Sequence, residues 1–286
     1  MTDLKCCQVT HNTKIKYYAD GSVKLSVANG QLYKDSDYVV SDSSTYHAPV
    51  VSRETDEETY FERKYKSRKD SIRRSRDKVF DIVKMNEFDF FFTGTFSDDC
   101  GFDRYNADEV CKKVTTFMYN LVKRGKIIRY IFVPEFHQDG AVHYHGFIKS
   151  GDSIRYMLAR NPYTGKAIRR GKNRKFVFNW LDWSFGYTTL MHCYGTVDNM
   201  SKYFCKYITK SSDFPMKHRY YAGGDIVRVV PTDYVDLDFY SVPCDVTVTD
   251  FGEFKYIAFK SVDDFSYFLL CFMTQYEINH YFLKGG

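Results

Sequence analysis

The chain has 286 residues, of which 44% are hydrophobic and 27% carry a charge, as in an ordinary soluble globular protein. That length can hold one large domain or two smaller ones, each with a buried core. The longest apolar run, residues 267–273, is too short to cross a bilayer, which argues against a membrane-spanning protein. The net charge of +5 is too small to indicate a nucleic-acid partner unless the charges are clustered.

Eight cysteines are scattered along the chain and none forms a C-x-x-C pair, so we interpret them as reduced thiols that pack as small hydrophobic groups. The sequence opens with no signal peptide. We therefore expect a cytoplasmic protein.

The N-terminal part of the chain divides into a polar segment and a basic helix. Residues 1–55, rich in Ser, Thr and Asp, are expected to form an extension of unclear role with short strands such as 23–27. A helix dense in Lys and Arg is predicted from Glu57 to about Val83. Its charges either form a solvated face or follow a phosphate backbone. On the second interpretation the candidate DNA-binding residues are Arg68, Lys69, Arg73 and Arg74.

The central part of the chain alternates strands with helices. The aromatic run 88–96 predicts a strand that ends in small polar residues. Asn106 or Asp108 can cap a helix whose apolar residues fall at helical spacing and which Gly125 ends. Further strands are predicted at 127–136 and 142–148, and a short helix at 153–159.

A loop that begins at residue 161 carries a second cluster of basic residues. Its candidate DNA-binding residues are Arg169, Arg170, Lys172 and Arg174. Strands are predicted after it at 176–178 and 187–192, and a helix at 197–210. Residues 231–286 are expected to form a C-terminal extension with a helix capped by Ser261.

This order of elements, β-α-β-β followed by strands and a helix, predicts an α+β fold with a central antiparallel sheet and helices packed on one face of it. Residues 56–230, which include the basic helix, would form the main domain. The extensions 1–55 and 231–286 would flank it.

Strands 127–136 and 142–148 would form a hairpin with Glu135 on one strand and two histidines on the other. His143 and His145, two residues apart, project from the same face of a strand. A two-residue turn would direct Glu135 away from them. A three-residue turn at 139–141, with a left-handed glycine in the middle, places Glu135 opposite His145 and His137 opposite His143.

Two imidazoles and a carboxylate with open coordination positions suit Mn²⁺ or Mg²⁺ held against a phosphate. The candidate metal ligands are His143, His145 and Glu135, with His137 as an alternative third ligand. A His-x-His motif alone is short enough to arise by chance. The prediction therefore depends on Glu135 and on the glycine turn.

Tyr203, Lys206, Tyr207 and Lys210 fall at positions i, i+3, i+4 and i+7 of the predicted helix and share one face. One interpretation is an amphipathic helix with tyrosines at the core boundary and lysines outside. The other is a pair of tyrosines that attack phosphorus, helped by lysines that stabilise the developing negative charge. The helix alone does not decide between these interpretations.

Together these features resemble the HUH superfamily of single-strand endonucleases, and within it the rolling-circle replication initiators of small phages and plasmids. The first family motif, an aromatic strand ending in small polar residues, corresponds to 90–96, although Gly94 stands where a bulkier residue is common. The second, His-hydrophobic-His, corresponds to 143–145 with Glu135 upstream, and the third, a helix with nucleophilic tyrosines, to 203–210. Two tyrosines spaced around a lysine are similar to the microvirus gene A family.

The resemblance, which covers residues 75–225, implies an endonuclease and strand transferase that works through a 5′-phosphotyrosine on Tyr203 or Tyr207. A divalent metal would polarise the scissile phosphate of single-stranded or extruded origin DNA, and the freed 3′-OH would prime a host DNA polymerase. The second tyrosine would cleave the regenerated origin so that the displaced strand is closed. The sequence contains no G-x-x-x-x-G-K-[ST] motif, so a host helicase would separate the strands. A phage-encoded chain would work in the cytoplasm of its bacterial host.

Two alternatives remain open. A two-tyrosine transposase or a plasmid relaxase would use the same chemistry. A non-enzymatic nucleic-acid-binding module would instead stack bases on the aromatic residues of its sheet and hold phosphates with its basic segments.

Overall fold

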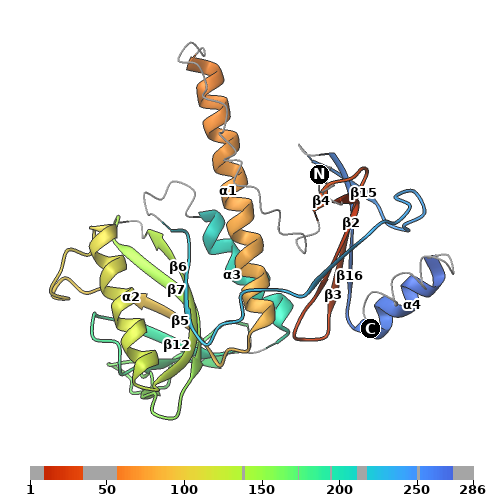
Figure 1. Cartoon of the computed structure of the whole chain (residues 1–286). Coiled ribbons are helices and arrows are strands. Elements are labelled where there is room, and N and C mark those ends of the chain that lie inside the picture. Colours follow the sequence, from red (N-terminus) through yellow and green to blue (C-terminus); the bar gives the residue numbers. More distant parts are fainter. Residues whose placement is uncertain are drawn as a thin grey trace, which may run out of the picture. The chain divides into compact units, whose positions relative to one another are not determined.

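The computed structural model of the chain describes residues 10–34, 57–136, 139–172, 174–193, 195–210, 218–249 and 252–272. The chain forms two compact units, whose elements are labelled in Figure 1. Unit 2 consists of residues 56–228, and unit 1 combines residues 1–55 with residues 229–286. Within the described ranges, no helix is both long enough and apolar enough to cross a membrane.

Unit 2 is built on a seven-stranded sheet in the order β13-β6-β7-β5-β12-β11-β8, with every neighbouring pair antiparallel. Its strands are β5 (Phe90–Thr95), β6 (Ile127–Phe136), β7 (Val142–Ser150), β8 (Tyr156–Leu158), β11 (Phe178–Trp180), β12 (Thr188–His192) and β13 (Tyr221–Gly224). A separate hairpin joins β9 (Arg169–Arg170) to β10 (Lys175–Phe176).

Helices cover both faces of this sheet. The helix α2 (Ala107–Lys123) lies on one face, and α1 (Glu57–Met85) and α3 (Val197–Lys210) lie on the other (Figure 1). Successive side chains of β5 point to opposite faces, so Phe90 and Phe92 pack toward α2 while Phe91 packs toward α1 and α3. The prediction that helices cover one face is wrong, because consecutive apolar residues in these strands require cover on both sides.

The structure confirms the α+β class and most of the predicted elements, including the basic helix and the helix at 197–210. The side chain of Asn106 accepts a hydrogen bond from the backbone of Glu109 at 3.2 Å and caps α2, and Gly125, with φ of +67°, follows the end of that helix. The predicted helix at 153–159 is wrong: its central residues form the edge strand β8, which pairs with β11. The predicted strand at 176–178 is divided between β10 and β11.

Unit 1 is a five-stranded sheet in the order β14-β2-β3-β16-β15. Its strands are β2 (Thr13–Tyr17), β3 (Val23–Ala28), β14 (Thr232–Val235), β15 (Val246–Thr249) and β16 (Gly252–Phe259); the short strands β1 (Thr10–His11) and β4 (Tyr33–Lys34) pair beside it. The two terminal segments, which the sequence places in separate extensions, therefore pair with each other in one sheet.

The helix α4 (Val262–Phe272) packs on unit 1 through Phe265, Phe268 and Leu269. Ser261 caps it as predicted, because its hydroxyl accepts a hydrogen bond from the backbone of Asp264 at 3.1 Å. The continuation of the predicted helix beyond residue 272 lies outside the described residues.

Candidate active site

The hairpin of β6 and β7 places Glu135, His143 and His145 on one face of the sheet. Glu135 pairs with His143 and Val133 pairs with His145. The predicted register, with Glu135 opposite His145, is therefore wrong by two residues. A shift of two residues leaves every side chain on its own face, so the carboxylate still faces both histidines. Gly140 in the turn has a φ of +87°, the left-handed conformation that the prediction required.

The three side chains are held in a connected set of contacts. The Nε2 atom of His145 lies 2.8 Å from Oε2 of Glu135. The Nδ1 atom of His145 lies 3.2 Å from the hydroxyl of Thr93, and Nδ1 of His143 lies 3.3 Å from the hydroxyl of Thr95. The threonines orient each ring through Nδ1, which makes Nε2 the candidate ligand atom of both histidines.

The donor set was compared with the needs of a divalent cation. Among the described residues, no three His, Cys, Asp or Glu side chains gather closely enough to hold a metal ion. The one measured donor pair nevertheless fits, because neighbouring ligands of an octahedral ion with bonds of about 2.1 Å lie about 3 Å apart. The separation of 2.8 Å between Glu135 and His145 matches that spacing, and His143 shares their face of the sheet. His137, the alternative ligand, lies outside the described residues.

The helix α3 brings the tyrosine motif onto this hairpin. The rings of Tyr207 and His145 stack with centroids 3.9 Å apart and planes 19° apart. The hydroxyls of Tyr203 and Tyr207 lie 2.7 Å apart, within hydrogen-bonding distance. Phe204 and Ile208, both fully buried, fix the helix to the sheet from its other side. The two predicted motifs, distant in sequence, therefore meet in one site.

The two tyrosines differ in environment. Tyr203 is 44% exposed and Tyr207 is 9% exposed. Burial, the hydrogen bond with Tyr203 and the nearby charge of Glu135 hold the pKa of Tyr207 well above its ordinary value. A phenol in such a place is protonated at neutral pH, so it needs added positive charge nearby to become a nucleophile.

The two predicted lysines lie on the same helix. The ammonium group of Lys206 lies 5.7 Å from the ring centroid of Tyr203. Lys210 is the last residue of α3, and its side chain lies outside the described part of the structure.

A cavity of about 640 Å³ opens over the hairpin. It is lined by Thr93, Thr95, Glu135, Phe136, His143, His145, Arg170, Tyr187, Thr188 and Thr189. Arg170 comes from β9, and Tyr187, which precedes β12, is 76% exposed. A cation and an aromatic ring therefore stand at the wall of a cavity whose base carries the candidate metal ligands. That combination suits a phosphate and a base of a nucleotide.

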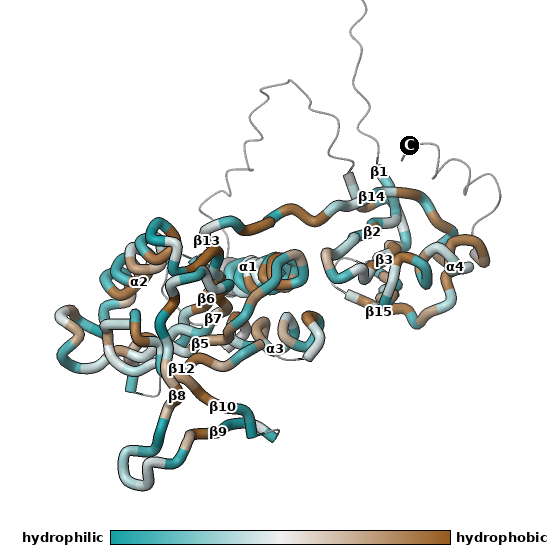
Figure 2. Tube along the Cα trace, turned by 90° about the horizontal axis from the view of Figure 1, so that it is seen from below, coloured by the Kyte–Doolittle hydropathy of each residue, from teal (hydrophilic) through white to brown (hydrophobic). Residues whose placement is uncertain are grey.

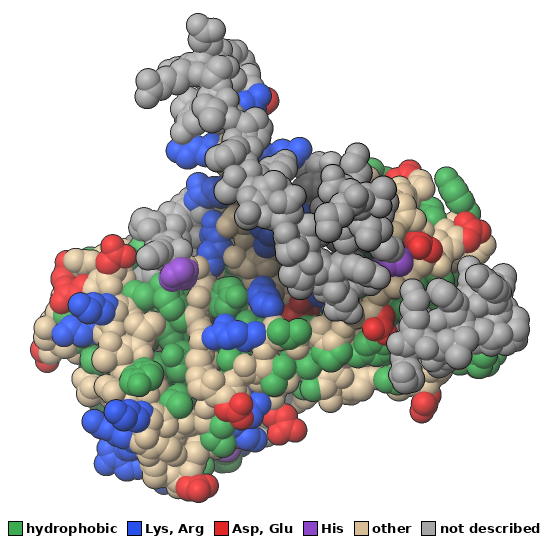
Figure 3. Space-filling model, viewed as in Figure 1, with side chains coloured by type: hydrophobic (Ala, Val, Ile, Leu, Met, Phe, Trp, Pro, Cys, Tyr) green, Lys and Arg blue, Asp and Glu red, His purple; other side chains and the backbone are tan. Residues whose placement is uncertain are grey.

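The other predicted DNA-binding residues lie on two exposed surfaces of unit 2. Arg68, Lys69, Arg73 and Arg74 are exposed on α1, and Figure 3 shows Lys and Arg side chains gathered along this helix. Arg169, Lys172 and Arg174 are exposed on the hairpin of β9 and β10, which extends from the sheet with a hydrophilic tip in Figure 2. The guanidinium of Arg169 lies 4.0 Å from the ring centroid of Phe176. Their contact with DNA stays a prediction.

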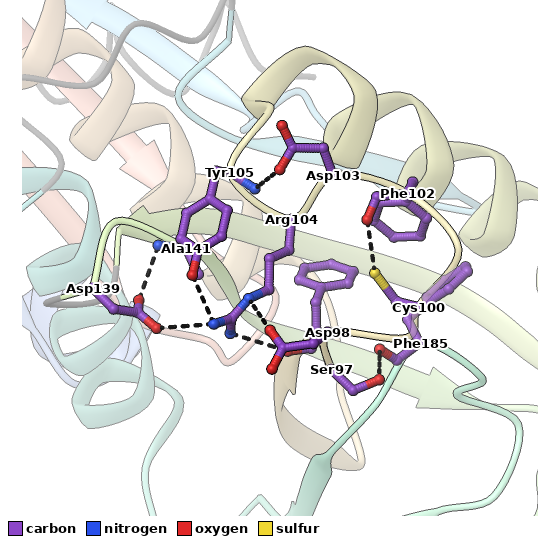
Figure 4. Close-up of polar contacts among 11 residues, drawn as sticks. Ser97, Asp98, Cys100, Phe102, Asp103, Arg104, Tyr105, Asp139, Ala141 and Phe185 are labelled. Carbon is purple, nitrogen blue, oxygen red and sulfur yellow. Dashed lines mark hydrogen bonds and ion pairs between the residues drawn. The ribbon is translucent and has the colours of Figure 1, made fainter.

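An arginine fixes the turn of the metal-binding hairpin, as Figure 4 shows. Arg104, in the loop before α2, lies 3.3 Å from the carboxylate of Asp139 and 3.0 Å from that of Asp98. The backbone carbonyl of Arg104 accepts a hydrogen bond from Val142 at 3.1 Å, and the carboxylate of Asp139 accepts one from Ala141 at 3.0 Å. The start of β7, and with it His143, is thereby attached to the rest of the sheet.

Sequence reasoning missed several of these residues. Thr93 and Thr95 lie two residues apart in the first motif, so strand alternation alone could have placed them on the face of the histidines. The departure of that motif at Gly94 also has a structural reason. A Cβ atom there would lie 2.7 Å from the ring of Trp183, so only glycine fits beneath it. No sequence signal pointed to Tyr187 or Arg104.

Comparison with known proteins agrees with the location of this site. The family of replication-associated proteins that comprises ORF2 and the gene 2 protein matches residues 89–212, which is less than half of the chain. The match begins just before β5 and ends just after α3, so it contains Thr93, Thr95, the hairpin and both tyrosines. No curated protein and no solved structure shows significant similarity to the chain. The matched segment is therefore similar to replication-associated proteins.

Proposed function

We propose that the chain is a rolling-circle replication initiator of the two-tyrosine HUH type, which nicks and rejoins single-stranded origin DNA. The observation that carries this proposal is the stack of Tyr207 on His145, which joins the candidate nucleophiles to the candidate metal ligands. That contact lies inside the segment similar to replication-associated proteins.

In the proposed reaction, the cavity above the hairpin receives the scissile phosphate. Arg170 pairs with a phosphate oxygen, and Tyr187 stacks on a neighbouring base. Held in this way, the phosphorus lies within reach of the tyrosine hydroxyls, so that attack is effectively intramolecular.

The covalent step exchanges one phosphodiester for another. The phenol oxygen of one tyrosine forms a bond to phosphorus and loses its proton, and the bond from phosphorus to the 3′ oxygen of the preceding nucleotide breaks. That oxygen takes up a proton and leaves as a free 3′-OH. Because a phosphodiester is retained as a 5′-phosphotyrosine, the reverse step can rejoin DNA without ATP, and the second tyrosine can repeat the exchange at a regenerated origin.

Glu135, His143 and His145 would hold the divalent ion, Mn²⁺ or Mg²⁺. When bound, the ion would supply positive charge to a non-bridging phosphate oxygen and to the incoming phenolate. Thr93 and Thr95 keep the two imidazole rings oriented for it. In replication, a host helicase and a host DNA polymerase would act on the strands that this reaction frees.

Incubation of the purified chain with Mn²⁺ and single-stranded oligonucleotides that tile its own replicon tests the proposal. We expect one oligonucleotide to be cleaved, with its 5′ end attached to the protein through a bond that survives denaturation in detergent. A chain that binds the oligonucleotides but gives no covalent product with Mn²⁺, Mg²⁺ or any other divalent metal is a non-enzymatic binding module, and the proposal is then wrong. Genes beside the coding sequence separate a phage initiator from a transposase or a plasmid relaxase.

A further inference from the structure

The sheet of unit 1 has two faces of different chemistry. One face packs on α4 through a core that includes Ile15, Leu25 and Phe265. Neighbouring residues of the same strands point the other way, and the register aligns them across the sheet. We call this second face the Lys–Tyr face; it carries Lys14, Lys16, Lys24, Tyr234, Phe254 and Tyr256.

Cations and aromatic rings alternate across the Lys–Tyr face. The ammonium group of Lys14 lies 4.8 Å from the ring centroid of Tyr33 on β4, which in turn lies 6.4 Å from the ring of Tyr234. Farther across the sheet, the ammonium of Lys24 lies 6.0 Å from the ring of Tyr256. That ring stacks on Phe254 with centroids 5.8 Å apart and planes 10° apart, and it is 44% exposed.

The charges on this face are arranged at a cost to folding. Lys16 and Lys24 pair directly across β2 and β3, and like charges in that position repel each other. Acidic residues of the same unit, Asp263 and Asp264, lie in the first turn of α4, which packs on the opposite face of the sheet. Positive charge is thus concentrated on the face that also presents the aromatic rings. An anionic ligand would relieve the repulsion between the lysines.

A sheet face that offers flat rings between ammonium groups matches one class of ligand. Unpaired bases stack on aromatic side chains, and the phosphates between them pair with lysines. A duplex does not fit in the same way, because its bases are already stacked and its surface is phosphate and sugar. Acidic peptides would account for the lysines but not for the stacked, exposed ring of Tyr256.

We propose that the Lys–Tyr face of unit 1 binds single-stranded DNA, with bases on Tyr256 and Tyr234 and phosphates on Lys14, Lys16 and Lys24. This surface goes beyond the proposed function, which uses residues of unit 2 alone. It would give the chain a second hold on the strand that the active site cuts, so that binding to the longer strand gains from two linked sites.

The test uses the full chain with Tyr203→Phe and Tyr207→Phe as background, so that binding is measured without cleavage. Fluorescence anisotropy gives the dissociation constant for a labelled oligothymidylate of about 16 nucleotides, the upper site size of a sheet-based single-strand binder. We expect Tyr256→Ala to weaken binding about tenfold, as loss of one stacked base implies. Lys16→Glu with Lys24→Glu should weaken binding at low salt and flatten its salt dependence.

Matched controls come from the same unit. Tyr240 and Tyr267 are 79% and 72% exposed but lie off the Lys–Tyr face, so Tyr240→Ala and Tyr267→Ala should bind as the background does. Tyr256→Phe keeps the ring and should also bind normally, which separates stacking from a folding defect. Thermal unfolding of each variant checks that unit 1 is intact.

Photo-cross-linking locates the bound strand directly. An oligonucleotide that contains bromodeoxyuridine should cross-link to tryptic peptides with Tyr256 or Tyr234. The inference is overturned if cross-links map to unit 2 alone, or if Tyr256→Ala and the double lysine variant bind as tightly as Tyr267→Ala. A wild-type chain that cleaves nothing but cross-links at Tyr256 would contradict the proposed function and support this surface.

Discussion

The ring of His145 stacks on the ring of Tyr207 at 3.9 Å, and the same imidazole contacts Glu135 through its Nε2 atom at 2.8 Å. One histidine therefore connects the carboxylate on β6 to the buried tyrosine on α3. An ion bound at Nε2 would lie next to the phenols, where its charge favours a phenolate. The chemistry that we propose depends on this adjacency.

Substitution of the tyrosines tests whether both are nucleophiles. Tyr203→Phe and Tyr207→Phe should each keep partial nicking of the cognate oligonucleotide, and the double variant should be inactive, because either phenol can reach the phosphate from the same helix face. Gel analysis of cleaved and attached DNA measures this. If one single variant is already inactive, the other tyrosine has a structural role and the two-nucleophile exchange is wrong.

Removal of metal ligands should act on metal binding before it acts on folding. Glu135→Gln and His145→Ala should each weaken Mn²⁺ binding, measured by isothermal titration calorimetry, by more than the roughly 10–100-fold that loss of an outer-shell partner costs. Nicking should fall in parallel and recover partly at high Mn²⁺. Unchanged metal affinity in both variants would show that the hairpin does not hold the ion.

Thr93→Val tests the orienting role of the threonines, since valine has the same shape but cannot contact Nδ1 of His145. We expect Mn²⁺ affinity to fall about 10–100-fold, with little change in the dissociation constant for DNA. Thr116→Val, a change in an exposed residue of α2, is the matched control. Equal metal affinity in Thr93→Val and the control would assign Thr93 to packing alone.

The sequence predicted the facing of the site better than its register. Alternation with a period of two put Glu135 on the face of His143 and His145, and that result survives the shift of two residues along β6. The length of the hairpin connection was not encoded in a recognisable turn motif, so the pairing itself was misjudged. Gly140 was recognisable because a left-handed turn position favours glycine.

Pairing between distant segments was beyond reach of the sequence. Residues 156–158 look helical or extended by composition and become β8 only because β11, after the basic loop, pairs with them. In the same way, β3 and β16 lie at opposite ends of the chain, and nothing in either strand names its partner. Local patterns predict elements; long-range pairing decides how they assemble.

Asp182 should make the stability of unit 2 sensitive to acid. Its side chain is 3% exposed and contacts Lys126 and, at 3.0 Å, Arg155. Burial alone would raise its pKa, but hydrogen bonds from Lys126 and Arg155 outweigh burial and hold the pKa below the ordinary value. The lowered pKa contributes stability that is fully present above pH ~4 and is lost as the pH falls through the folded-state pKa.

Asp182→Asn should therefore lower the free energy of unfolding at neutral pH by about 1.5–3 kcal/mol and flatten its decline in acid. Urea unfolding at a series of pH values measures both effects. Asp225→Asn is the control, because Asp225 is 82% exposed and lies 3.5 Å from Arg129, where an ion pair contributes little. Equal pH profiles for wild type and Asp182→Asn would contradict this assignment.

Mass spectrometry of the covalent product tests the central claim most directly. The wild-type chain is incubated with Mn²⁺ and its cleaved oligonucleotide, digested with trypsin and nuclease, and searched for a peptide that carries a nucleotide. The account predicts a nucleotide joined through its 5′-phosphate to Tyr203 or Tyr207. A nucleotide on any other residue, or cleavage that leaves no protein-bound nucleotide, would contradict it.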